Sequence, residues 1–70
     1  MSTRQQVEVK IRRHPSGNLT LMERHVDASL WTDVTFPDLL HSDPASFYRH
    51  VARRLADHAM NGITVVSYMD

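Results

Sequence analysis

The chain has 70 residues, no cysteine, 41% hydrophobic and 23% charged residues, and a formal net charge of zero. A chain this short supports one hydrophobic core, so we expect a single domain spanning residues 1–70. These totals argue against a disordered chain, against a disulfide framework or a thiolate metal site, and against an indiscriminate nucleic-acid binder, which needs an excess of positive charge.

The first predicted element is a strand in which apolar and charged residues alternate. The alternation runs from Val7 to Arg12, and a period of two is typical of a strand with one buried face. The sequence HPSGN at residues 14–18 combines three turn-forming residue types, so we expect a hairpin with residues 19–25 as its second strand. The side chains expected to form the core of this hairpin are those of Leu19, Leu21, Val9 and Ile11.

Residues 26–41 contain apolar side chains whose spacing fits neither a helix nor a strand for more than a few positions. We prefer a short third strand within residues 29–36, followed by a helical turn within residues 35–40, because Pro37 would then occupy a first helical position. Residues 26–45 carry four aspartates and no basic residue. This middle segment is therefore acidic.

The clearest predicted element is a helix over residues 44–60. Ser42 or Asp43 can cap its first N–H groups, a proline stands at its first position, and the Asn61–Gly62 pair supplies the left-handed residue that ends helices. At about 100° per residue, the side chains expected to face inward are those of Phe47, Val51, Leu55, Tyr48, Ala59 and Ala52. Those expected to be solvated are Arg49, Arg53, Asp57, His50 and Arg54.

Residues 63–69 form the last predicted strand, and its adjacent Val65 and Val66 are typical of an interior strand with two buried faces. The predicted fold class is therefore α+β, with the order β-β-(β)-α-β. A small antiparallel or mixed sheet, made of the N-terminal hairpin and the C-terminal strand, is covered on one face by one amphipathic helix. Because a crossover through a helix is normally right-handed, the last strand is expected to lie parallel to the first.

Five histidines raise the question of a metal site. A helix presents two ligands on one face at positions i and i+4, whereas His50 and His58 are eight positions apart, so we predict no metal site and no cofactor. Most of the histidines are expected at the surface. We expect His58, at the border of the buried helix face, to form a hydrogen bond with the backbone.

No sequence motif favours catalysis. Two glycines cannot build a glycine-rich phosphate loop. The neighbouring His41, Ser42 and Asp43 have the residue types of a catalytic Ser-His-Asp triad, but neighbours in sequence seldom point at one another. We therefore expect the protein not to be an enzyme.

A basic stripe on the outer helix face is the first candidate for binding a partner. Arginine side chains can form paired hydrogen bonds with phosphates or carboxylates. The competing interpretation is an ordinary solvated helix face, in which Arg53 pairs with Asp57 one turn later. The stripe consists of Arg49, His50, Arg53 and Arg54.

The hairpin and the acidic segment supply two further candidates. Arg12 and Arg13, with Lys10 and His14, form a second basic group. We expect this group to be separate from the helix stripe, because the outer faces of a sheet and of the helix that covers it point in opposite directions. Trp31 is either an interface anchor or a core residue.

These features favour a small non-catalytic regulatory protein that binds stoichiometrically to another macromolecule, either a protein or a nucleoprotein complex. Its small size suggests an inhibitor encoded by a phage or mobile element. The alternative is a nucleic-acid-binding module that uses the hairpin and helix arginines. We expect a cytoplasmic location and no membrane association, because the sequence shows neither an apolar signal segment nor a run of about 18 apolar residues. Homodimerisation through an exposed edge strand remains open.

Overall fold

The structure is a computed structural model of the chain and describes residues 5–37, 39 and 43–70. The described residues form four strands and one helix in the order β1 (Gln6–Arg13), β2 (Leu19–His25), β3 (Thr32–Val34), α1 (Pro44–Met60) and β4 (Thr64–Met69). The predicted α+β class and the predicted order of elements are confirmed.

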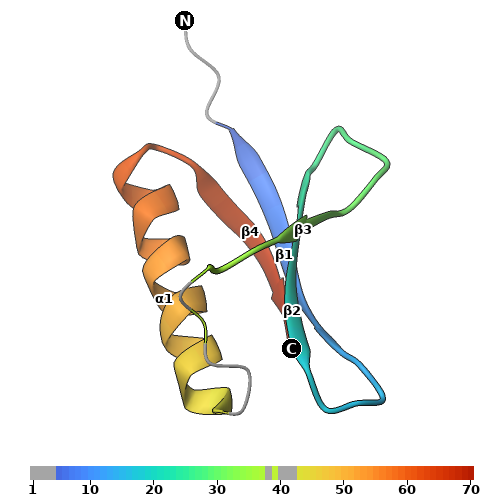
Figure 1. The fold of residues 1–70 in the computed structure, drawn as a ribbon. Helices are drawn as coiled ribbons and strands as arrows, with labels where there is room; N and C mark the ends of the chain where they lie inside the picture. Colours follow the sequence, from blue (N-terminus) through green and yellow to red (C-terminus); the bar gives the residue numbers. More distant parts are fainter. Residues whose placement is uncertain (1–4, 38, 40–42) are drawn as a thin grey trace, which may run out of the picture.

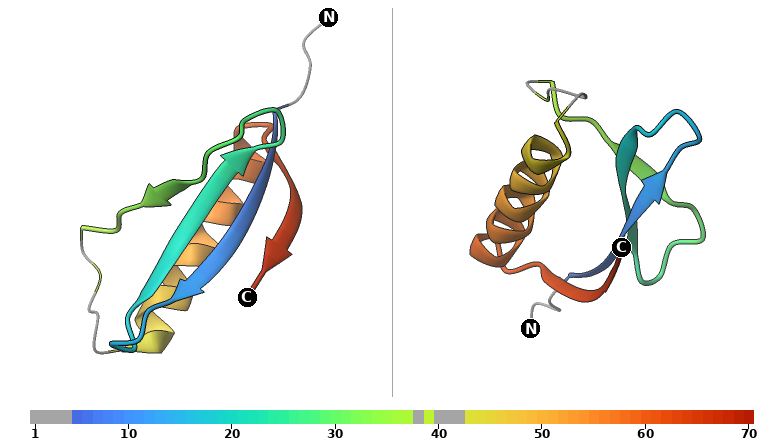
Figure 2. Two further views of the ribbon diagram at one scale, coloured as in Figure 1. Left: turned by 90° about the vertical axis from the view of Figure 1, so that its right-hand side faces the viewer. Right: turned by 90° about the horizontal axis from the view of Figure 1, so that it is seen from below.

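The strands form one mixed sheet in the order β3-β2-β1-β4, with α1 on one face (Figures 1 and 2). β1 and β2 are antiparallel, as are β2 and β3. β4 is parallel to β1, as the crossover through the helix predicts. However, β4 lies at an edge of the sheet, so the prediction of an interior strand is wrong. Val66, at a shift in the register between β4 and β1, is 48% exposed there.

The hairpin turns where the sequence predicts it. Gly17 has a φ of 92°, a left-handed conformation that glycine adopts without steric cost, and the His14 N–H donates to Asn18 O at 2.9 Å. In the resulting register Ile11 lies opposite Leu21, as expected, whereas Val9 lies opposite Glu23. The inner face of β2 therefore carries a carboxylate next to the core position Leu21.

The hydrophobic core lies between α1 and the β1–β2 hairpin. Its central cluster consists of Val9, Ile11, Leu21, Phe47 and Val51. The buried arc of α1, which includes Phe47 and Val51, is narrower than the apolar arc predicted from the sequence. Ala52 and Ala59, expected to face inward, are exposed.

Local hydrogen bonds define both ends of α1. The Asp43 carboxylate accepts from the Ala45 N–H at 3.0 Å, while Ser42, the other predicted cap, lies outside the described residues. Gly62 follows the helix with a φ of 73°, and the Ile63 N–H donates to His58 O at 2.8 Å. In the described part of the chain, no helix has the length and apolar character needed to cross a bilayer.

Replacing Gly62 with alanine is expected to lower the free energy of unfolding by about 1 kcal/mol, because a side chain is strained in the left-handed conformation. A Cβ at this position meets nothing within 4 Å, so the loss would come from the backbone conformation alone. Gly62→Asn should cost less, because asparagine tolerates this conformation. Urea denaturation measures both, and equal losses for the two variants would contradict the argument.

The segment before the helix contains a shorter strand than the sequence suggests. β3 covers three residues within the predicted range 29–36. A turn follows, in which the Leu39 N–H donates to Phe36 O at 3.1 Å; the rest of the helical turn predicted within residues 35–40 includes residues outside the described part. The Phe36 ring packs edge-on against Phe47, with 6.2 Å between the ring centroids, and so closes one end of the core.

Candidate functional site

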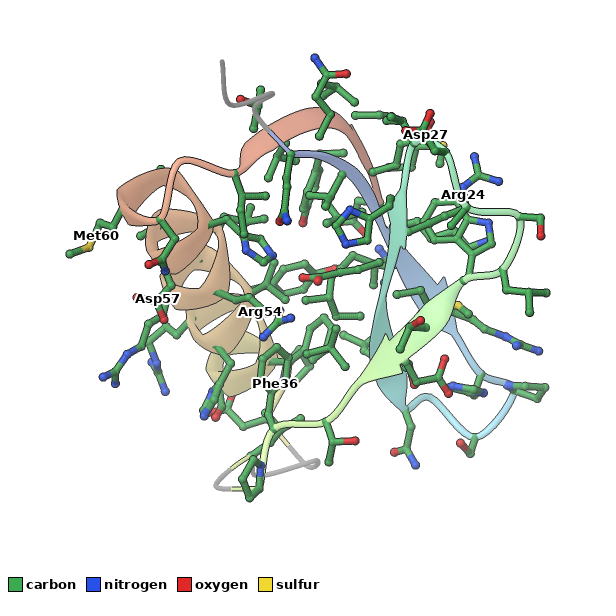
Figure 3. All side chains as sticks on the ribbon, turned by 90° about the horizontal axis from the view of Figure 1, so that it is seen from above. Arg24, Asp27, Phe36, Arg54, Asp57 and Met60 are labelled. Atoms are coloured by element: carbon green, nitrogen blue, oxygen red, sulfur yellow. The ribbon has the colours of Figure 1, made fainter. Side chains whose placement is uncertain are left out.

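The sheet has one face covered by α1 and one face that the helix leaves open. Because side chains alternate along a strand, the residues between the core positions of β1 and β2 point to the open face. Figure 3 shows Arg24 on the side of the sheet away from the helix. Register and alternation place on this open face the side chains of Lys10, Arg12, Met22, Arg24, Asp33 and Met69.

Trp31 lies on the open face, between two cationic side chains. The Lys10 Nζ is 4.2 Å from the Trp31 ring centroid, and the Arg24 guanidinium carbon is 4.7 Å from it. The Arg24 Nη2 also donates to a Glu8 carboxylate oxygen at 2.6 Å, which fixes this guanidinium beside the ring. We call Lys10, Arg24 and Trp31 the tryptophan cluster. Trp31 is partly buried, as a core residue would be, but it does not belong to the core cluster between helix and sheet.

The predicted helix stripe divides into two parts. Arg49 and Arg53 are exposed, as expected. His50 is half-buried: its Nδ1 donates to Ser46 O at 2.7 Å, and its ring centroid lies 5.3 Å from that of Phe36. His50 therefore packs against the segment before the helix, and the expectation that it is solvated is wrong. Arg49 lies near the helix cap, with its Nη2 at 3.8 Å from an Asp43 carboxylate oxygen. The Arg53–Asp57 ion pair considered above is not formed in the described residues.

Arg54 is the second stripe residue that the structure places elsewhere. Figure 3 shows Arg54 pointing into the space between helix and sheet, while Asp57 points away from the sheet. The Arg54 guanidinium donates to both carboxylate oxygens of Glu23, from Nε at 2.6 Å and from Nη2 at 2.9 Å. The expectation that Arg54 is solvated is wrong, because the Glu23 carboxylate on β2 faces the helix and requires donors.

His58 completes this group, which we call the Glu23 cluster: Glu23, Arg54 and His58. The His58 Nε2 donates to a Glu23 oxygen at 3.0 Å, and both side chains are only 12% exposed. The predicted backbone hydrogen bond of His58 is therefore wrong, since its partner is a carboxylate. Burial raises the pKa of the Glu23 carboxyl, but hydrogen bonds from Arg54 and His58 lower it more, so its pKa lies below the ordinary value of 4.5.

The Glu23 cluster connects β2 to α1 and contains two side chains of types that can bind metals. These are the side chains of Glu23 and His58, but a metal site needs at least three converging ligands. No group of three histidine, aspartate or glutamate side chains is suitably placed among the described residues. The cluster is instead a salt bridge between the second half of the helix and the sheet.

The two hairpin arginines point to opposite sides of the sheet. Arg12 is exposed on the open face. Arg13 lies on the helix side, where its Nη2 donates to Asp70 Oδ1 at 2.7 Å and to the Tyr48 hydroxyl at 3.3 Å. The Tyr48 hydroxyl in turn donates to Asp70 at 3.1 Å. Arg13 therefore pairs with Asp70 on the helix side and is separated by the sheet from Arg12.

The histidines are less exposed than the sequence suggests. His14 forms a hydrogen bond of 2.7 Å with the Thr20 hydroxyl, and His14, His50 and His58 are all half-buried. Only His25 is exposed among the histidines that the structure describes. His41 and Ser42, two members of the triad considered above, lie outside the described residues.

Four residues of these two clusters were not among the predicted partner-binding residues: Lys10, Arg24, Glu23 and His58. The alternation along β1 already places Lys10 on the face opposite Val9, and the hairpin register places Arg24 opposite Glu8. No local pattern, however, indicates that residues 26–31 return Trp31 to that face. Comparison with known protein families, with curated proteins and with solved structures found no match. The functional argument therefore depends on the geometry of these surfaces.

Proposed function

We propose that the protein is a non-catalytic interaction module that binds a macromolecular partner stoichiometrically through the open face of its sheet. The observation that carries this proposal is the tryptophan cluster. A tryptophan that packs under cationic side chains on a face not covered by a helix combines a large contact area with charged hydrogen-bond donors. Tryptophan and arginine are the residue types most enriched among residues that dominate binding energy.

The seven predicted partner-binding residues contribute unequally to this proposal. Trp31 and Arg12 lie on the open face and remain part of the proposed binding surface. Arg49 and Arg53 are exposed on the opposite side of the molecule and form a smaller second surface. The predicted residues already engaged within the fold are Arg13, His50 and Arg54.

Nucleic acid is the second candidate partner, and the same face supports it. Lys10, Arg12 and Arg24 can neutralise phosphates, and an indole ring can stack on a base. Glu8 and Asp33 on this face reduce its positive charge, which is why we favour a protein partner. Neutralising three phosphates of a duplex would give a slope of about −3 for the logarithm of affinity against the logarithm of salt concentration.

Trp31→Ala is expected to weaken partner binding by at least about 2 kcal/mol, or roughly thirtyfold, as for a residue that dominates an interface. The partner is captured on the immobilised protein with and without nuclease, and its affinity is then measured over a range of salt concentrations. Trp31 is the only tryptophan of the chain, so its fluorescence reports directly on whether the partner reaches this face.

Arg53→Ala is the matched control, because Arg53 is exposed on the outer helix face. Binding that survives Trp31→Ala but is lost with Arg53→Ala would contradict the open-face proposal and assign the helix instead. Loss of the partner after nuclease treatment, with the steep salt dependence given above, would assign the second candidate. Two further statements about such a module stay predictions. One is that it is located in the cytoplasm, and the other is that it is encoded by a phage or mobile element and inhibits a host protein.

A further inference from the structure

The two edges of the sheet differ in how well they are protected. Exposed edge strands are usually protected by charge, proline or shortness, because an unpaired edge can bind another strand. β3 covers three residues, includes Asp33, and is soon followed by Pro37. β4 covers six residues and contains no charge and no proline. A shift in register at Val66 gives β4 some protection, because a bulge twists an edge locally, but without charge or proline β4 is the less protected of the two edges.

The core is also incomplete beside β4. The buried hydrophobic side chains come from β1, β2 and the first half of α1, up to Val51. Among the described residues, β4 and the second half of α1 contribute none. Between these two elements lies a groove of about 380 Å³. Its lining residues are Leu55, Ala59, Gly62, Ile63, Thr64 and Val65.

The helix surface next to this groove is uncharged. Ala52 and Ala59 are exposed and lie within about 60° of Leu55 around the helix axis. The charged residues Arg49 and Asp57 lie on other sides of the helix. The β4 edge, the groove and this alanine flank therefore form one continuous uncharged surface, on which Val66 and Tyr68 are 48% and 44% exposed.

We propose that this surface binds a second copy of the chain, with β4 pairing antiparallel to the partner's β4 around a two-fold axis normal to the sheet. In a two-fold interface each surface meets its own copy, so a surface with net charge repels itself. The basic open face and the arginines of α1 would repel their own copies, whereas the β4 surface would not repel its copy. The axis keeps both helices on the same side of one continuous sheet, with the alanine flanks facing each other across the two grooves.

The size of the surface sets the expected strength of the dimer. A standard interface buries about 800 Å² on each partner, which is about 15% of the 5226 Å² exposed by this chain. A six-residue edge strand with one helix flank reaches the lower end of that range. We therefore expect a dissociation constant of about 1–100 µM, and a dimer that leaves both open faces available to partners.

Sedimentation equilibrium from about 1 µM to about 1 mM tests this proposal. The mass is expected to rise from 8.1 kDa to twice that value. Val66→Lys should raise the dissociation constant at least about tenfold, because two lysines then meet at the edge. Thr32→Lys is the matched control, since Thr32 is exposed in the opposite edge strand, and it should leave the dissociation constant unchanged.

Ala59→Arg is a second variant that leaves the strand intact and uses a good helix former, so it keeps the test decisive if Val66→Lys fails to fold. It is expected to weaken the dimer as well. Amide hydrogen exchange of β4 should slow as protein concentration rises, while that of β3 should not change. A monomer at about 1 mM, or equal weakening by Val66→Lys and Thr32→Lys, would overturn the proposal.

Discussion

Phe47→Ala is expected to lower the free energy of unfolding by about 3–5 kcal/mol, the range measured for truncating a buried aromatic residue. Phe47 is 3% exposed and packs edge-on against both Phe36 and Tyr48, with ring centroids 6.2 and 5.4 Å away. The variant would leave a cavity between the helix and the hairpin. A chain of 70 residues has a total stability of about 4–10 kcal/mol, so the variant should be marginally folded at 25 °C.

Met60→Ala is the matched control for this result. Met60 lies on the same helix but is 83% exposed, and a surface substitution of this kind changes stability by less than about 0.5 kcal/mol. Chemical denaturation followed by circular dichroism measures both variants. If Phe47→Ala cost no more than Met60→Ala, the helix would not pack on the sheet as described.

Glu23→Gln is expected to cost about 1–2 kcal/mol at pH 7, because the amide cannot accept both Arg54 hydrogen bonds as a carboxylate does and leaves the largely buried His58 with a weaker partner. Asp57→Asn, a change of the same kind at an exposed helix position, should alter stability by less than about 0.5 kcal/mol. Equal effects of the two substitutions would show that the Glu23 cluster does not hold the helix to β2.

The contribution of Glu23 should also depend on pH. Its pKa in the folded protein lies below 4.5, so the unfolded state binds the proton more readily and folding favours the ionised form. The stabilisation is therefore fully present above about pH 4.5 and is lost as the pH falls through the lower folded pKa. The difference in unfolding free energy between the wild type and Glu23→Gln should shrink below pH 4.5, and a constant difference would contradict the assigned pKa direction.

The helix shows how much of the fold is encoded locally. Its observed bounds, Pro44–Met60, agree with those predicted, because the signals that start and end it are Asp43, Pro44 and Gly62. Each acts through hydrogen bonds or dihedral angles within a few residues. The hairpin was predictable for the same reason, since the alternation along β1 and the turn at Gly17 require no knowledge of the rest of the chain.

The functional surfaces depended more strongly on tertiary contacts. Arg12 could be placed on the open face from alternation alone, because it follows the core position Ile11. Arg54 was wrongly assigned to the solvated arc, although on a helical wheel it lies only about 20° from Phe47. What turns it inward is the Glu23 carboxylate, which is 31 residues away in sequence.

The sequence by itself therefore determined the hairpin and its turn, the helix with both its ends, and the parallel return of the last strand. Only the tertiary structure decided that β4 is an edge strand, that Trp31 lies between Lys10 and Arg24, and that Arg54 and His58 bind Glu23. Local elements follow from the hydrogen bonds and dihedral angles of neighbouring residues. Edges, clusters and open faces depend on which distant residues meet, and in a chain with one small core that is decided by the packing of the whole molecule.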